Sequence, residues 1–366
     1  MRYVINRFRA PTGVPLPADA RVREFHRTLP GYEPTPLYRR GALARSLGIG
    51  ELYVKHEGAR FGLGAFKGLG ASWALHCLTR RQPGSFETVS AASEGNHGRA
   101  VAWAARLAGI PCTIFLPAHV ARERVENIRG EGASVTLVDG SYEDAVRRCD
   151  AESREHGWQV ISDVGYDGYL DIPELVVAGY HTLFQEVDEQ LDAAAWPPPD
   201  LVLIPGGVGG ILHAGVAHYA HRAGAPRVVG VEPSSADCLT ASLESPEGGP
   251  APATGDGETT MACLNCAEVS LSSWPAIRSG VDAMIAIDDP DAMEGVRLLY
   301  REAPGEPALE AGTSGAATTG AIGALMRDPR LSGLRRHLAL GSSSRVLVVC
   351  TEGAINRAEF ARCFSG

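Results

Sequence analysis

Lysine is the first residue type to consider, because the sequence has only Lys55 and Lys67 among 34 lysines and arginines. Lys67 lies in the segment FGLGAFKGLGAS (61–72), among glycines and small residues that suit a solvated surface charge poorly. Arginine stays protonated in proteins, whereas a desolvated lysine can lose its proton and act as a nucleophile or base. Lys67 is therefore a candidate reactive amine. The ordinary alternative is a lysine whose stem lies along apolar surface near a helix start.

The segment Pro205-Gly-Gly-Val-Gly-Gly210 is a candidate anion site, because it follows a short apolar run and precedes a helical pattern. Consecutive glycines let backbone N–H groups converge, and a helix start favours an anion, so a phosphate is the natural guest. The spacing is not that of a dinucleotide site, since Leu212 stands where the third glycine would be and Glu232 serves equally well as a loop residue. A tight strand-to-helix turn without a ligand is the alternative.

A third segment, Ser93-Glu-Gly-Asn-His-Gly98, also stands between an expected strand and an expected helix. Its backbone donors and small polar side chains suit a carboxylate. A plain capped helix start would account for Ser93 or Asn96, but not for two glycines and a histidine together. We expect His97 to line the site.

The end of the last expected strand, Cys350-Thr-Glu-Gly353, offers side chains that could bond the edge of a heterocycle. The eight cysteines fit reduced thiols in a core. Cys263-x-x-Cys266 has no second pair that would complete a zinc set, so we expect no metal. The sequence leaves open whether Cys238 and Cys266 are paired.

The elements that must position these residues alternate between strands and helices. In the first half, Ser141 with Asp144 opens one helix, and further elements are expected as strands at 88–92, 113–116, 134–138 and 160–161 and helices at 97–108 and 121–130. In the second half, a helix at 210–221 is accompanied by strands at 201–204, 228–231, 284–287 and 346–349. This alternation predicts an α/β fold with parallel sheets and right-handed crossovers.

Length and composition bound the organisation of the chain. Its 366 residues fit two intimate α/β domains, which we place at 1–68 plus 181–366 (large) and at 69–180 (small). A net charge of -9 without a basic arm argues against nucleic acid and anionic membranes as partners. The N-terminal sequence MRYVINRFRAPTG has no apolar signal-peptide core, so we expect a cytoplasmic protein.

Taken in order, the segments AFK, SEGNHG, PGGVGG and CTEG resemble the pyridoxal-phosphate enzymes of fold type II, the tryptophan-synthase β and threonine-dehydratase superfamily. Longer segments, among them RFGLGAFKGLGAS and HGWQVISDVGYDGY, are similar to the 2,3-diaminopropionate ammonia-lyases. The likeness runs from about Arg60 to Glu352, with gaps. It implies two domains, each a twisted and mostly parallel sheet flanked by helices, with pyridoxal 5′-phosphate as cofactor and a homodimer as the assembly.

The resemblance also implies the cofactor contacts. Lys67 would form the internal Schiff base, with Phe66 beside it, and would then take the substrate's α-proton. Asn96 would bond the cofactor's 3′-oxygen, and Cys350 or Thr351 would face the pyridine nitrogen as a neutral partner. The phosphate would lie on Gly206, Gly207, Val208, Gly209 and Gly210.

For the substrate, the resemblance implies that Ser93 and Gly95 help to hold the carboxylate, with His97 beside them, and that Asp163 binds the β-amino group. The family commonly has an aspartate, the base for the D-isomer, where this chain has Glu94. One extra methylene can move the carboxylate oxygen by about 1.5 Å, and such a displacement can cost on the order of a hundredfold in rate. The segment EAGTSGAA (310–317) also departs from the family pattern, so the substrate is less certain than the reaction type.

These inferences predict an α,β-elimination on a small amino acid, namely 2,3-diaminopropionate or a related β-substituted alanine, through an aminoacrylate to pyruvate and ammonia. Two alternatives remain. The aminoacrylate could instead be captured by a nucleophile in a β-replacement synthase, or the scaffold could be a non-catalytic binding protein. The intact Lys67, Asn96 and glycine loop argue against the second alternative.

Overall fold

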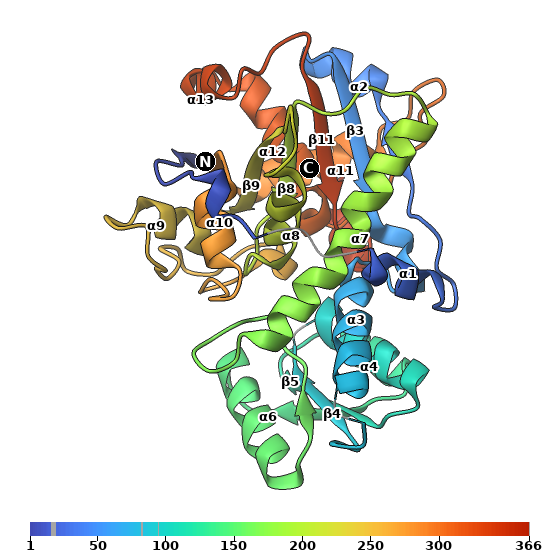
Figure 1. The fold of residues 1–366 in the computed structure, drawn as a ribbon. Helices are drawn as coiled ribbons and strands as arrows, with labels where there is room; N and C mark the ends of the chain where they lie inside the picture. Colours follow the sequence, from blue (N-terminus) through green and yellow to red (C-terminus); the bar gives the residue numbers. More distant parts are fainter. Residues whose placement is uncertain (16–19, 82, 94, 366) are drawn as a thin grey trace. The chain divides into compact units, whose positions relative to one another are not determined.

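The computed structural model describes residues 1–15, 20–81, 83–93 and 95–365. The chain divides into two compact units, and each contains one sheet with helices packed on it, so the α/β fold class is confirmed (Figure 1). Unit 1 consists of Met1–Pro17, Glu33–Ala65 and Leu183–Gly366, and unit 2 consists of Ala18–Tyr32 and Phe66–Thr182.

The sheet of unit 1 has seven strands in the order β1-β10-β9-β8-β11-β3-β2. The strands from β10 to β3 pair in parallel, whereas the two edge strands, β1 and β2, pair antiparallel. The central strands are short apolar runs that are buried throughout, as expected for a parallel sheet with covered faces. The strands are β1 Arg2–Ile5, β2 Leu37–Arg39, β3 Glu51–His56, β8 Leu201–Pro205, β9 Arg227–Pro233, β10 Ala283–Ile287 and β11 Arg345–Cys350.

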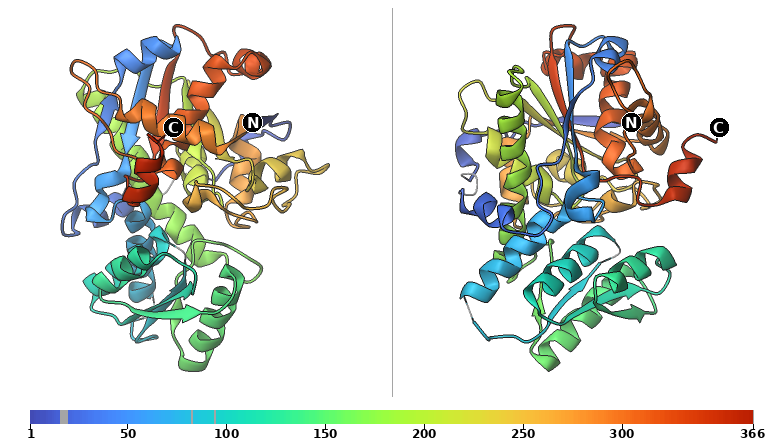
Figure 2. Two further views of the ribbon diagram at one scale, coloured as in Figure 1. Left: turned by 180° about the vertical axis from the view of Figure 1, so that it is seen from behind. Right: turned by 90° about the vertical axis from the view of Figure 1, so that its right-hand side faces the viewer.

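Helices surround this sheet (Figure 2). One of them, α12, has the buried residues Thr313–Leu325 and packs on β8, β9, β10 and β11. The helices of unit 1 are α2 Gly41–Leu47, α8 Gly210–Tyr219, α9 Cys238–Glu244, α10 Trp274–Gly280, α11 Asp289–Tyr300, α12 Thr313–Arg327, α13 Ser332–His337 and α14 Arg357–Arg362, with 3₁₀ turns at Pro11–Gly13, Glu57–Gly62, Ala262–Leu264 and Pro329–Leu331.

The sheet of unit 2 has four parallel strands in the order β6-β5-β4-β7. Because parallel connections are right-handed, α4 and α5 lie on one face and α6 lies on the other. The expected strands and helices of this unit are confirmed to within about two residues, and the predicted capping box of Ser141 and Asp144 is present. The elements are α1 Arg21–Arg27, α3 Lys67–Arg81, β4 Val89–Ala92, α4 Asn96–Ala108, β5 Cys112–Pro117, α5 Arg122–Gly130, β6 Ser134–Val138, α6 Tyr142–His156 and β7 Gln159–Val160.

The small unit also includes residues 18–32, 66–68 and 181–182, so it is larger than the expected range 69–180. Helix α1 packs on α3, and its His26 joins two distant parts of the unit. The ring contacts Leu69 O at 2.9 Å through Nε2 and Thr182 Oγ1 at 2.7 Å through Nδ1. The division between the units falls inside one continuous helix, α7 (Asp171–Ala193).

The second lysine of the chain, Lys55, lies in a buried ionic network of unit 1. Its Nζ, on β3, donates to Glu186 Oε2 at 2.7 Å, and neither side chain is exposed. Arg60 bonds both oxygens of Glu186 and both oxygens of Glu57 at 2.7–2.9 Å. Two cations therefore face two carboxylates, which satisfies the requirement that buried charges be paired. The network fixes Arg60 in the segment that leads to Lys67.

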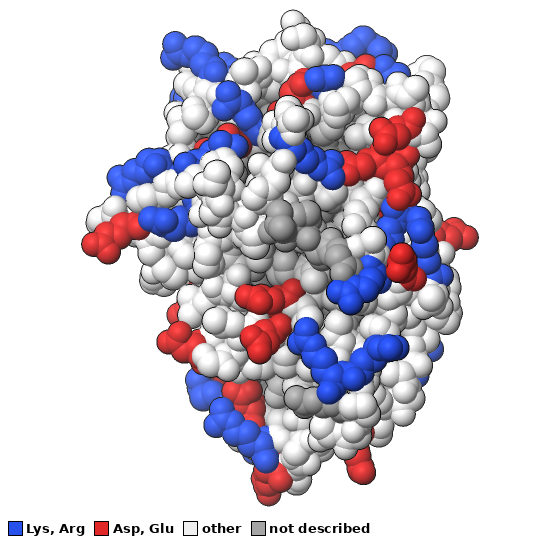
Figure 3. Space-filling view, in the orientation of Figure 1, with Lys and Arg blue, Asp and Glu red and all other residues white. Residues whose placement is uncertain are grey.

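The surface carries charges of both signs. On the face drawn in Figure 3, Lys and Arg side chains lie beside Asp and Glu side chains in many places. Exposed ion pairs of this kind contribute little to stability, because water screens them and the long side chains lose freedom. Among the described residues, no helix is both long enough and apolar enough to cross a membrane.

Candidate active site

Lys67 is the first residue of α3 in unit 2, and aromatic rings lie next to its amine. Nζ is 5.1 Å from the ring centroid of Phe66 and 6.0 Å from that of Tyr180, and these two rings are themselves 4.7 Å apart. The Lys67 side chain is 20% exposed, so its amine is accessible although the surrounding residues are mostly buried. Phe66 thus lies beside the amine, and its contact with the cofactor stays a prediction.

Asp163 holds this amine, because Lys67 Nζ donates a hydrogen bond to Asp163 Oδ2 at 2.5 Å. Burial alone would raise the pKa of Asp163, but the positive charge of Lys67 and the hydrogen bond that its amine donates hold that pKa well below its ordinary value. The carboxylate therefore stays ionised and acts as a fixed acceptor for a cationic nitrogen. The structure thus joins Lys67 and Asp163, which lie 96 residues apart in the sequence.

His97 completes this group as a second acceptor. Its Nε2 donates to Ile161 O at 2.9 Å, so the proton of the neutral ring resides on Nε2. Its Nδ1 is buried, forms no hydrogen bond within the described part of the chain, and lies 3.8 Å from Asp163 Oδ2. Burial lowers the pKa of His97, although the Asp163 carboxylate opposes that shift. A neutral ring then presents a lone pair close to the carboxylate, and this pair of acceptors suits an ammonium group.

The SEGNHG loop connects β4 to α4. Ser93 is buried, and its Oγ accepts hydrogen bonds from Gly95 N at 3.1 Å and from Gly98 N at 2.9 Å. The Ser93 hydroxyl thus organises the loop, which explains why a serine precedes the helix here. Asn96 is the first residue of α4 and is half-buried. Glu94, the expected D-face base, lies outside the described residues.

The glycine loop of unit 1 connects β8 to α8 and has the geometry of an anion cradle. Gly207 and Gly209 have φ values of 58° and 108°, which residues other than glycine rarely adopt. A Cβ at Gly206 would come within 2.7 Å of Leu239, and one at Gly209 within 2.5 Å of Ile277. The N–H groups of Gly207 and Val208 donate no hydrogen bond within the described residues. The first N–H groups of α8 have no intrahelical acceptor either, so several donors are available to one anion.

Two side chains close to this loop have structural partners. The buried carboxylate of Glu232 accepts hydrogen bonds from Leu239 N at 3.1 Å and Thr240 N at 2.7 Å, and burial raises its pKa to about 8. Those bonds to α9 account for this acidic residue without a nucleotide ribose. Cys238 Sγ lies 3.9 Å from Gly207 O. Cys238 and Cys266 are not joined by a disulfide bond in the described structure.

The residues after β11 differ in what their side chains can reach. Cys350 belongs to the apolar core of unit 1, and its Sγ donates to Glu352 O at 3.4 Å. Burial raises the pKa of its thiol. Thr351 Oγ1 makes no hydrogen bond within the described residues, although the residue is 4% exposed. Thr351 is thus better suited than Cys350 to bond a ligand.

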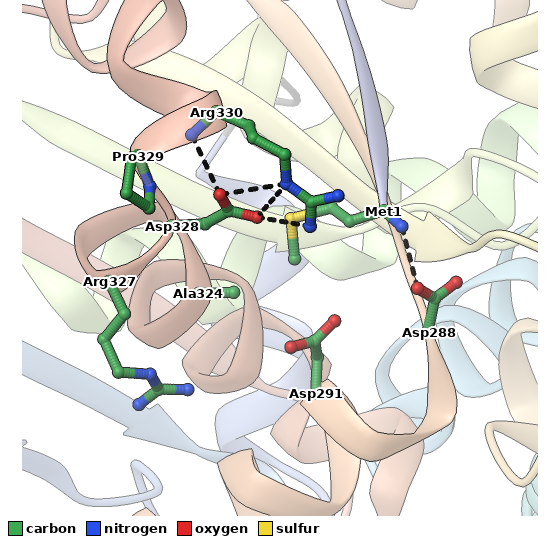
Figure 4. A pocket seen from close by; sticks show the side chains of 8 residues that line it. All are labelled: Met1, Asp288, Asp291, Ala324, Arg327, Asp328, Pro329 and Arg330. Carbon is green, nitrogen blue, oxygen red and sulfur yellow. Dashed lines mark hydrogen bonds and ion pairs between the residues drawn. The ribbon is translucent and has the colours of Figure 1, made fainter.

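A cavity of about 360 Å³ elsewhere in unit 1 contains none of the residues expected to act (Figure 4). Four of its charged groups form two ion pairs: the N-terminal amine of Met1 contacts Asp288 Oδ2 at 2.7 Å, and Arg330 contacts Asp328 at 2.7 Å. We therefore do not assign the reaction to this cavity. The tautomer of His97 and the ionic network of Lys55 could not be predicted from the sequence, because both depend on residues far apart in the chain.

Known proteins are similar to this chain in sequence and in fold. The family model described as "Pyridoxal-phosphate dependent enzyme" matches residues 28–352. Diaminopropionate ammonia-lyase of Salmonella typhimurium (strain LT2) is 36% identical over 355 residues, which cover 91% of this chain and 88% of that protein. Two crystal structures of diaminopropionate ammonia-lyase from Escherichia coli superpose with TM-scores of 0.89 and cover 99% of this chain and 96% of theirs. One, 31% identical, is a complex with D-serine, and the other, 32% identical, is a complex with an aminoacrylate-PLP azomethine reaction intermediate.

Proposed function

Because this chain belongs to the family of pyridoxal-phosphate-dependent enzymes, we propose that it eliminates the β-amino group of 2,3-diaminopropionate, or of a closely related β-substituted alanine, to give pyruvate and ammonia. The observation that carries the proposal is the contact between Lys67 Nζ and Asp163 Oδ2, with His97 Nδ1 beside that carboxylate. This arrangement places a reactive amine and an acceptor for the substrate's β-ammonium group in one unit.

The described residues fit the cofactor. The glycine loop offers backbone N–H groups that donate no hydrogen bond within the described residues. Its positive φ angles belong to glycines, which have no side chain to keep a phosphate away from the backbone. Lys67 offers an accessible amine for the cofactor's aldehyde, and Thr351 offers an uncharged hydroxyl for its pyridine nitrogen. We propose that Gly206, Gly207, Val208, Gly209 and Gly210 hold the phosphate, with Asn96 and Phe66 contacting the ring.

Bound pyridoxal phosphate supplies an electron sink for the negative charge that develops at the substrate's α-carbon. Lys67 Nζ takes the α-proton from one face, and Glu94 takes it from the other. Asp163, held ionised, keeps the substrate's β-amine protonated, and His97 Nδ1 accepts a hydrogen bond from the same ammonium. The C–N electron pair then departs with nitrogen as neutral ammonia, and water hydrolyses the released aminoacrylate to pyruvate and a second ammonia. The SEGNHG loop, organised by the hydroxyl of Ser93 and by Gly95, receives the substrate carboxylate.

A product assay tests this proposal. Purified protein is incubated with each enantiomer of 2,3-diaminopropionate, serine and O-acylserine, with and without an added thiol or amine nucleophile. Pyruvate and ammonia formed from 2,3-diaminopropionate without a nucleophile are the expected result. A β-substituted alanine formed only when a nucleophile is present would instead identify a β-replacement synthase. Protein that stays colourless with added cofactor and forms no product would indicate a binding protein.

The assembly and the location belong to the same proposal. We propose a homodimer, so light scattering should give about twice the 38.7 kDa of one chain, and a mass equal to one chain would contradict it. We also propose a cytoplasmic location, which cell fractionation tests.

A further inference from the structure

Tyr169 lies in the loop that follows β7, and its hydroxyl bridges two backbone groups of the segment leading to Asp163. Tyr169 Oη donates to Val160 O at 3.0 Å and accepts from Ser162 N at 3.1 Å. These groups flank Ile161, whose carbonyl receives the hydrogen bond from His97 Nε2. One hydroxyl therefore fixes the backbone on both sides of the residue that orients His97, directly before Asp163.

The position of β7 in the sheet explains why such a bridge is needed. β7 is the short edge strand of unit 2, and its inner side bonds the β4 side of the sheet through Gln159 N to Thr88 O at 2.9 Å and Ile161 N to Ser90 O at 2.8 Å. Since backbone groups alternate along a strand, Val160 O and Ser162 N lie on the outer edge. No further strand pairs there in the described sheet. The Tyr169 hydroxyl supplies the donor and the acceptor that a neighbouring strand would provide.

Tyr169 is itself held by a tight turn. Two hydrogen bonds join the backbones of Tyr166 and Tyr169, at 3.2 Å and 2.8 Å, and Gly168 has a φ of 80° between them. The two rings stack with centroids 5.0 Å apart and an angle of 14° between planes. The backbone hydrogen bonds and the stacked ring of Tyr166 thus hold Tyr169 in place. The Tyr166 hydroxyl, in contrast, makes no hydrogen bond within the described residues.

We propose that Tyr169 is a positioning residue for Asp163 and His97, and that its hydroxyl thereby sets the preference of this site for amino acids with a β-ammonium group. The inference rests on the proposed function and adds to it the residue that aligns the ammonium acceptors. A substrate or inhibitor without a β-ammonium, such as serine, depends on these acceptors much less.

The test compares Tyr169→Phe with the matched control Tyr166→Phe, each of which removes one hydroxyl from the stacked pair. Because an error of 1 Å in alignment can cost about a hundredfold in rate, Tyr169→Phe should lower kcat/KM for 2,3-diaminopropionate by about ten- to a hundredfold, mainly through KM. The inhibition constants of D- and L-serine should change by less than about twofold, and the control should behave as wild type on both counts. Equal losses for 2,3-diaminopropionate and serine, or equal effects of both variants, would overturn the proposal.

A second readout needs neither cofactor nor substrate. Hydrogen–deuterium exchange of the cofactor-free protein should accelerate in a peptide covering residues 160–164 in Tyr169→Phe and not in Tyr166→Phe, because the Ser162 amide loses its acceptor. Unchanged exchange would refute the bridge. A wild-type protein that leaves 2,3-diaminopropionate intact would refute the proposed function and the substrate preference, whereas the exchange result would still decide whether Tyr169 holds the segment.

Discussion

At the scale of single residues, the account depends on one carboxylate in contact with one amine. Asp163 accepts a hydrogen bond from the cationic amine of Lys67, so its charge is stabilised by that amine rather than by exposure. The proton of the neighbouring His97 points away from Asp163. The sequence pattern identified each of these residues separately. It could not show which nitrogen of His97 faces Asp163, because Ile161 O settles that question and is distant in the chain.

Replacing Asp163 by Asn should show this stabilisation as a dependence on pH. The pKa of Asp163 in the folded protein lies below its unfolded value of about 3.9. The ionised carboxylate therefore stabilises the folded protein above about pH 3.9, and this stabilisation is lost as the pH falls through the folded pKa. In cofactor-free protein, Asp163→Asn should lower the free energy of unfolding by about 1–3 kcal/mol at pH 7. The difference from wild type, measured by urea denaturation, should shrink below about pH 4. A difference that is constant with pH would contradict the assignment.

Glu94 gives a second prediction at this scale, taken from the sequence resemblance alone. If its carboxylate is the base for the D-isomer, Glu94→Gln should lower turnover of D-2,3-diaminopropionate by about a hundredfold or more and leave that of the L-isomer nearly intact. Initial rates of pyruvate formation on the separate enantiomers check this. The same loss on both isomers would mean that Glu94 has another role.

At the scale of elements, alternation of short apolar strands with helices predicted most of the fold. The structure contains each strand that was expected to begin near residue 88, 113, 134, 201, 228, 284 or 346. Each of these strands is a short apolar run flanked by turn residues. The placement of α1 with unit 2 was not predictable, since it depends on the contacts of His26 with Leu69 and Thr182. The Lys55 network was missed because ionic partners at distant positions leave no periodic pattern in the sequence.

The ionic network around Lys55 should contribute strongly to the stability of the folded protein, and one substitution can test this. Among the described residues, Glu186→Gln leaves the buried cations Lys55 and Arg60 with Glu57 as their one charged partner. Breaking a buried ion pair from one side typically costs about 3–5 kcal/mol, and chemical denaturation should detect a loss of that order. Glu310→Gln is the matched control, since Glu310 pairs with Arg357 on the surface, and it should change stability much less. Equal effects of the two variants would show that the buried network is not a major support.

At the scale of the whole molecule, each unit carries one half of the predicted chemistry. Unit 2 contains the amine, the ammonium acceptors and the carboxylate loop, and unit 1 contains the glycine loop and Thr351. The sequence assigned the glycine loop to the large domain and the carboxylate loop to the small one, because each of these loops follows an expected strand. The sequence also placed Lys67 in the large domain (1–68), whereas the structure groups Lys67 with unit 2. It could not predict which neighbour each side chain would use, as the different surroundings of Cys350 and Thr351 show.

Identifying the amine that carries the cofactor tests the role proposed for Lys67. Holoenzyme is reduced with borohydride, digested and analysed by mass spectrometry, and only three amines compete: Lys55, Lys67 and the N-terminus. The account predicts a phosphopyridoxyl group on Lys67 alone, and no visible absorbance band in Lys67→Ala. Modification of Lys55 or of the N-terminus in place of Lys67, or an unchanged spectrum in Lys67→Ala, would contradict it.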